Sequence, residues 1–121
     1  MSKAYVVSTF DMVNVADLDL LRQVDQRCEE MVIAVLSDEL VTSLHGRPAV
    51  VPEAERLELV RNLRISDKVL LCTKLDDLPS DGELLTDEES LAYRASAVLT
   101  PARRSASPEL LAALAAPGVT R

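Results

Sequence analysis

Short apolar runs alternate with amphipathic stretches along the chain as far as residue 72. Continuous apolar runs cover residues 4–8 and 31–36, and between them apolar side chains recur at helical spacing, at Leu18, Leu21, Val24 and Cys28. Apolar runs without polar alternation are typical of strands in a parallel sheet that is covered on both faces. The pattern therefore predicts a β-α-β unit with a right-handed crossover.

A second unit of the same kind follows the first. Pro52 suits the first turn of a helix, whose inward positions are predicted to be Ala54, Leu57, Val60 and Leu63. This helix leads to a strand over residues 68–72. Such an alternation predicts a three-layer α/β/α domain with a mostly parallel, Rossmann-like sheet, in which the first strand is central and helices lie on both faces.

The chain becomes strongly acidic after residue 72. Residues 73–95 are predicted to form an acidic loop followed by a short helix, with Thr86 and Glu89 as a capping box at its start. A brief strand at 97–99 and a C-terminal helix within 105–118 complete the prediction. A length of 121 residues corresponds to a single domain over residues 1–121.

Composition and charge narrow the classes of function. A hydrophobic content of 48 % predicts a packed core, whereas 2 % aromatic residues and a net charge of −7 argue against nucleic acid as a partner. Cys28 and Cys72 lack metal or redox spacing, which predicts reduced, buried thiols and a cytoplasmic location. The sequence has no signal-peptide pattern and no apolar run of membrane-spanning length, so we expect no membrane partner.

The turn after the first predicted strand carries the most specific pattern. Residues 8–18 read Ser-Thr-Phe-Asp-Met-Val-Asn-Val-Ala-Asp-Leu. This segment resembles the signature of cytidylyltransferase-like nucleotidyltransferases such as glycerol-3-phosphate cytidylyltransferase, which runs Gly-Thr-Phe-Asp, two apolar residues, and His-x-Gly-His. Further collinear matches to the family lie at residues 37–39, 46–52, 55–56 and 60–69. Several separate blocks in order are more specific than one short motif.

The resemblance implies a nucleotidyltransferase fold and a reaction that transfers a nucleotidyl group. Enzymes of this family transfer CMP or AMP from CTP or ATP, with Mg²⁺, to a small phosphorylated acceptor and release pyrophosphate. Turn amides, a helix N-terminus and the two motif histidines hold the triphosphate. The resemblance also implies a homodimer through the segment 64–71. The nucleotide-binding positions that it implies here are Ser8, Thr9, Phe10, Asp11, Asn14, Asp17, Arg103, Arg104, Ser105 and Ser107.

The chain departs from the family at each chemically distinctive position of the turn. Asn14 and Asp17 replace the two histidines, Ala16 replaces the glycine between them, and Ser8 replaces the leading glycine. A carboxylate at position 17, about 4 Å from a phosphate charge, would repel it by roughly 4 kcal/mol at an effective dielectric constant near 20. We therefore assign no catalytic residue. We expect a degenerate domain that is catalytically inactive and has a structural, binding or regulatory role.

Other interpretations of the same residues remain open. A divergent active nucleotidyltransferase would use Asn14 and the Arg103/Arg104 pair to replace the lost charge. Asp17 also suits an N-cap or a first-turn acid of the following helix. Phe10 suits the core, and Asp11 suits binding of loop amides. A lone His45 is expected at the surface. The acidic run 73–95 lacks a calcium-loop pattern, so no metal site is expected. Besides a homodimer, a protein partner is a candidate.

Overall fold

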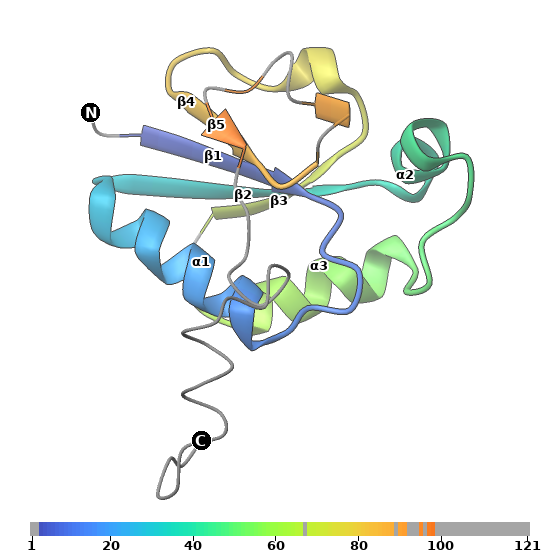
Figure 1. The fold of residues 1–121 in the computed structure, drawn as a ribbon, viewed down its shortest axis with the longest axis horizontal. Coiled ribbons are helices and arrows are strands. Elements are labelled where there is room, and N and C mark those ends of the chain that lie inside the picture. The colour runs from blue at the N-terminus through green and yellow to red at the C-terminus, as the bar shows by residue number, and fades with distance from the viewer. Residues whose placement is uncertain (1–2, 67, 89, 92–94, 96, 99–121) are drawn as a thin grey trace, which may run out of the picture.

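The central feature of the fold is one five-stranded sheet. The computed structural model describes residues 3–66, 68–88, 90–91, 95 and 97–98. Within them, all strand pairings are parallel, and the strand order β3-β2-β1-β4-β5 puts β1 in the middle (Figure 1). The strands are β1 Lys3–Ser8, β2 Glu30–Leu36, β3 Lys68–Cys72, β4 Glu83–Thr86 and β5 Ala97–Val98. The predicted parallel sheet with a central first strand is thus confirmed.

Helical segments cover both faces of the sheet, as predicted. They are α1 Val15–Arg27, α2 Asp38–His45, α3 Glu53–Asn62 and the 3₁₀ turn η1 Leu75–Asp77. Figure 1 shows α1 and α3 below the sheet, with the segment that contains η1 above it. Residues of α2 pack against the face of the sheet opposite to α1 and α3. Leu75, the first residue of η1, and Leu78, which follows η1, pack on this same face. The result is the three-layer α/β/α arrangement of a Rossmann-like fold.

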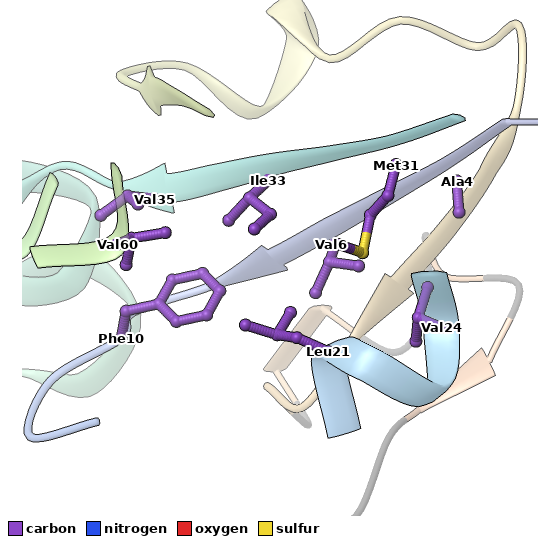
Figure 2. Packing of buried hydrophobic residues seen from close by; sticks show 9 residues of the cluster. All are labelled: Ala4, Val6, Phe10, Leu21, Val24, Met31, Ile33, Val35 and Val60. Atoms are coloured by element: carbon purple, nitrogen blue, oxygen red, sulfur yellow. The ribbon is translucent and has the colours of Figure 1, made fainter. Parts of the chain in front are cut away.

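Alternating side chains of β1 and β2 build a hydrophobic cluster on each face. The cluster under α1 and α3 is drawn in Figure 2 and contains Ala4, Val6, Phe10, Leu21, Val24, Met31, Ile33, Val35 and Val60. The opposite cluster contains Val7, Ala34, Leu36, Val41, Cys72 and Leu91. Because both faces of β1 and β2 are buried, these strands need apolar residues at successive positions, which explains the continuous runs in the sequence.

Two parts of the fold differ from the prediction. Helix α2 lies between β2 and α3, and it is capped by Ser37, whose hydroxyl accepts a hydrogen bond from the amide of Leu40. Thr86 ends strand β4, where its Oγ1 donates to the carbonyl oxygen of Val7 on the neighbouring strand at 2.6 Å; its predicted capping partner Glu89 and residues 92–94 of the predicted helix lie outside the described residues. Pairing with β1 thus turns part of the predicted acidic loop into a strand.

The predicted inward face of α3 also needs one correction. Val60 is buried and Leu57 packs against the core, but Ala54 is exposed and Arg56 is buried instead. Of the predicted strand at 97–99, the structure describes Ala97–Val98, and the predicted helix within 105–118 lies outside the described residues. Neither Cys28, which is half-buried, nor Cys72, which is buried, forms a disulfide within the described part of the chain. Among the described residues, none of the helices is both long and apolar enough to cross a membrane.

Candidate functional site

An open cavity of about 180 Å³ lies at the carboxyl ends of β1 and β4. These adjacent central strands belong to the two halves of the sheet, since the chain proceeds from β1 to β2 on one side and from β4 to β5 on the other. Such a change of direction is where ligands bind in open parallel sheets. The cavity is smaller than the roughly 300–1,000 Å³ of typical small-molecule sites. It is therefore the candidate site, although a confined one.

Five of the residues singled out by sequence line this cavity: Ser8, Thr9, Phe10, Asp11 and Asp17. They come from the end of β1, the β1–α1 turn and the first turn of α1. The other walls come from the C-terminal end of α2, the loop that follows it, and the residues after β4. Arg103, Arg104, Ser105 and Ser107 lie outside the described residues. The β1–α1 turn is thus the part of the predicted site that the structure describes.

The β1–α1 turn has an unusual backbone conformation. Phe10 and Met12 have φ angles of 55° and 60°, in the left-handed region that costs a residue with a side chain about 1–2 kcal/mol. The Phe10 ring is buried and points into the cluster toward Leu21 (Figure 2). The Asp11 carboxylate accepts hydrogen bonds from the amides of Val50 and Val51 at 2.8 and 2.9 Å. Core burial and these bonds offset the strain, so Phe10 and Asp11 hold the turn in place.

Asn14 and Asp17 cap helix α1 reciprocally. The Asn14 side chain accepts a hydrogen bond from the Asp17 amide at 3.2 Å, and the Asp17 carboxylate accepts one from the Asn14 amide at 3.1 Å. This capping box satisfies two of the amides that a helix N-terminus leaves without partners. The acid in the first turn also lies favourably in the helix dipole. Two of the amides at this helix end, those of Asn14 and Asp17, are thus occupied by the chain itself.

A buried arginine connects the segments around the cavity. The Arg56 side chain is fully buried, and it donates hydrogen bonds to the carbonyl oxygens of Thr9 at 2.6 Å, Leu36 at 2.7 Å and Val51 at 2.8 Å. It also pairs with the Asp38 carboxylate at 2.7 Å. A buried guanidinium is tolerated only when its donors are satisfied in this way. Arg56 therefore holds the β1–α1 turn, the end of β2 and the start of α2 together.

The first residues of α2 and α3 bind each other's backbone. The amide of Asp38 donates to the Glu53 carboxylate at 2.7 Å, and the amide of Glu53 donates to the Asp38 carboxylate at 3.2 Å. The pKa of Asp38 lies below its usual range, chiefly because its carboxylate accepts the hydrogen bond from Arg56. Burial opposes this shift, and the hydrogen bond from the Glu53 amide adds to it. The first amide of each of these two helices is thereby satisfied by a carboxylate of the other helix.

Glu88 crosses the mouth of the cavity. Its carboxylate accepts a hydrogen bond from the Thr9 hydroxyl at 2.6 Å and lies 2.7 Å from His45 Nε2. The Glu88 amide donates to Thr86 Oγ1 at 3.0 Å, which turns the chain back toward the cavity after β4. His45 is exposed, as the sequence predicts, and it also lines the cavity. The sequence does not single out Glu88, because its partners Thr9 and His45 are distant in the chain and its neighbours are a run of similar acids.

The cavity lining is acidic on balance. Carboxylates of Asp11, Asp17, Asp87 and Glu88 line it, whereas Arg47 and His45 are the basic residues of the lining. Among the described residues, no group of three or more histidine, cysteine or acidic side chains is placed to hold a metal ion. The arrangement offers hydrogen-bond acceptors in excess of donors, which suits a phosphate group poorly.

Known proteins resemble this chain in sequence and in fold. The chain is 29 % identical over 69 residues to an FAD synthase of Pyrococcus abyssi, covering 57 % of this chain and 47 % of that protein. It therefore spans about half the length of that curated relative. The crystal structure of a lipopolysaccharide core biosynthesis protein from Thermoplasma volcanium has the same fold, with a TM-score of 0.57, 22 % identity, and coverage of 64 % of this chain and 62 % of that one.

A family description matches a longer stretch than either protein. The model of the cytidylyltransferase-like family matches residues 5–92, from β1 through the segment after β4, which is well over half of the chain. This range includes the β1–α1 turn, the α2–α3 loop, Arg56 and Glu88. The chain therefore belongs to the cytidylyltransferase-like family.

Proposed function

We propose that this chain is a degenerate cytidylyltransferase-like domain that no longer transfers nucleotides and has a structural, binding or regulatory role. The observation that carries the proposal is the reciprocal cap between Asn14 and Asp17. These residues stand where the resembling enzymes carry the two histidines that hold the triphosphate. In this chain both side chains are engaged with helix amides, and one of them adds a negative charge to the cavity.

Electrostatics and size support the same proposal. A triphosphate would have to approach Asp11, Asp17 and Glu88 in a cavity of about 180 Å³. Bringing phosphate charges about 4 Å from one such carboxylate costs roughly 4 kcal/mol at an effective dielectric constant near 20. That free energy corresponds to about three decades of affinity. Tight binding of CTP or ATP is therefore not expected in the native sequence.

Calorimetric titration with CTP and Mg²⁺ tests the proposal. We expect no binding below millimolar concentration by the wild-type protein, and measurably better binding by the variant Asp17→Asn, whose amide oxygen still caps the helix. Restoring the family residues at 14, 16 and 17 together, as Asn14→His, Ala16→Gly and Asp17→His, should improve binding further. Asp25→Asn is the matched control, because it removes one charge from an exposed position on the same helix.

Three outcomes would contradict the proposal or its electrostatic explanation. Sub-millimolar binding of CTP by the wild-type protein would show that the capped turn still accepts a triphosphate. Equal gains in Asp17→Asn and in the control would show that overall charge, and not the charge at the turn, governs binding. Unchanged affinity in all variants would mean that the cavity is closed to nucleotides for another reason.

A divergent active enzyme is the second candidate, and a cavity at the position where ligands bind in this fold favours it. The relative from Pyrococcus abyssi is named an FAD synthase, so ATP with FMN is a rational substrate pair to test beside CTP with glycerol 3-phosphate. In this case Mg²⁺ with CTP or ATP would be required. Release of pyrophosphate that depends on the acceptor would support activity, and its absence with both pairs would support the degenerate domain.

A binding role has support on the surface of the domain. Met12, Val15 and Val50 are large hydrophobic residues that are 67 %, 76 % and 69 % exposed, and Asp11 joins the two loops that carry Met12 and Val50. Exposed apolar side chains that lie together are typical of protein contacts. A homodimer and a further protein partner both belong to this proposal. Reduced cysteines agree with a cytoplasmic setting, which we propose as well.

A further inference from the structure

We propose that Glu88 takes the place of an external oxyanion in the cavity, so that the protein carries a phosphate-group site closed by its own side chain. The inference deepens the proposed function, because it concerns the same cavity and rests on that cavity having lost its nucleotide. It assigns a role to Glu88 and His45, which neither the sequence motif nor the family comparison does.

The geometry around Glu88 is that of a bound anion. Its carboxylate is held by a hydroxyl at 2.6 Å and by an imidazole nitrogen at 2.7 Å, and its side chain is only 11 % exposed. Thr9 follows β1, and His45 is the last residue of α2. Two donors from separate elements therefore converge on one carboxylate at the edge of the sheet where this fold binds ligands. Arg47 lines the same cavity and adds positive charge beside them.

The position of Glu88 is determined by the sheet. Thr86 Oγ1 donates to the carbonyl oxygen of Val7 and accepts from the amide of Glu88, so the end of β4 ties the backbone at Glu88 to β1. The carboxylate is consequently held at the cavity mouth by backbone that is paired in the central part of the sheet. An oxyanion from solution cannot reach Thr9 and His45 together while Glu88 accepts from both.

Removing the carboxylate should open the site to a compact oxyanion. The Thr9 hydroxyl and the His45 imidazole then face the cavity without an acceptor, and one of the negative charges in the lining is gone. Charge-assisted hydrogen bonds favour an acceptor with several oxygens, which inorganic phosphate supplies. Asp17 and Asp87 still line the cavity and oppose the anion, so we expect a gain relative to wild type and not tight binding.

Titration with inorganic phosphate, followed by ³¹P NMR, is the test. We expect Glu88→Ala to bind phosphate at least about tenfold more tightly than the wild-type protein, because the competing carboxylate and its charge are removed. Glu88→Gln removes the charge and keeps the side-chain volume, so its gain should be smaller. Glu83→Ala is the matched control, since it removes an exposed acid from the opposite end of β4 and should bind as wild type does.

The double variant His45→Ala with Glu88→Ala identifies the donor. Loss of most of the gain in this variant supports the proposal, whereas full retention would overturn it. Circular dichroism verifies that the variants are folded. Phosphate affinity equal to that of the wild type in both Glu88 variants would also overturn the proposal. If the alanine variant does not fold, the phosphate affinity of Glu88→Gln decides between the two outcomes. Binding of CTP by the wild-type protein would contradict the proposed function, whereas these phosphate titrations address only Glu88.

Discussion

Arg56 is the residue on which the surroundings of the cavity depend most. Its guanidinium satisfies carbonyl oxygens from three segments that are separate in sequence, and it pairs with Asp38 on α2. Because the side chain is fully buried, no solvent would replace it without rearrangement. A single side chain thus determines how the β1–α1 turn lies relative to the end of β2.

Replacing Arg56 by alanine should destabilise the protein by about 3–5 kcal/mol, since three carbonyl oxygens lose a buried donor at about 1–3 kcal/mol each. Urea denaturation measures this loss. The control is Arg61→Ala, an exposed position on the same helix, where a change within about 0.5 kcal/mol is expected. A loss of less than about 1 kcal/mol for Arg56→Ala would mean that water replaces the guanidinium easily.

Asp38 makes the stability dependent on pH. Its pKa lies below the ordinary value of 3.8, chiefly because of the hydrogen bond from Arg56. A lowered pKa in the folded state gives stability that is complete above the ordinary pKa and is lost as the pH falls through the lower folded value. The stability difference between wild type and Asp38→Asn should therefore be constant at neutral pH and shrink below about pH 4. Unfolding curves at several pH values test this, and a difference that is independent of pH would contradict it.

At the scale of elements, strand β4 depends on a close approach to β1. Gly82 comes directly before β4, and a Cβ atom there would lie 2.7 Å from the carbonyl oxygen of Lys3. Gly46, by contrast, follows the end of α2 with a φ of +74°, and a Cβ atom on Gly46 would have no other atom within 4 Å. The first glycine is required by space and the second by backbone conformation.

Asparagine substitution should separate these two requirements. Gly46→Asn should cost well under about 1 kcal/mol, because asparagine tolerates the left-handed region. Gly82→Asn should cost about 1–3 kcal/mol, because a backbone oxygen must move to admit any side chain. Thermal unfolding of the two variants gives the comparison. Equal losses would show that the approach of β4 to β1 is less close than described.

At the scale of the whole molecule, the free edge of the sheet bears on assembly. Within the described residues, β3 is the outermost strand on its side, and Leu70 on this strand is 37 % exposed. Unpaired edge strands are surfaces that proteins cover by contact with another element or chain. The proposed homodimer would cover this edge.

Sedimentation of the purified protein tests the dimer. We expect a dimer at micromolar concentration, and a shift toward monomer in Leu70→Lys, because a charge would then be buried at the contact. Gln23→Lys is the control, since it adds the same charge at an exposed position on α1 that belongs to neither proposed contact. A folded wild-type protein that sediments as a monomer would exclude this assembly.

Local patterns in the sequence determined much of the fold. The apolar runs at β1 and β2 and the helical spacing in α1 depend on residues close together in the chain, so periodicity alone located these elements. The cap between Asn14 and Asp17 is equally local, and Asp17 was recognised from sequence as a first-turn acid of the helix. Helix α2 was missed because it has only 8 residues, too short for a clear period.

Only the tertiary structure decided what surrounds the cavity. Thr9 and Glu88 are 79 residues apart and meet because β4 lies beside β1 in the sheet. Thr9 and Arg56 are 47 residues apart and meet because α3, which carries Arg56, packs against the same sheet. The structure buries Arg56 on α3, where the hydrophobic pattern predicted Ala54. Carbonyl oxygens of other segments accept the hydrogen bonds of the Arg56 guanidinium there, and a hydrophobic pattern contains no information about such partners. The sequence by itself determined most of the elements and the departures of the β1–α1 turn from the family signature, whereas the order of the strands and the packing of the helices on them determined which side chains meet at the site.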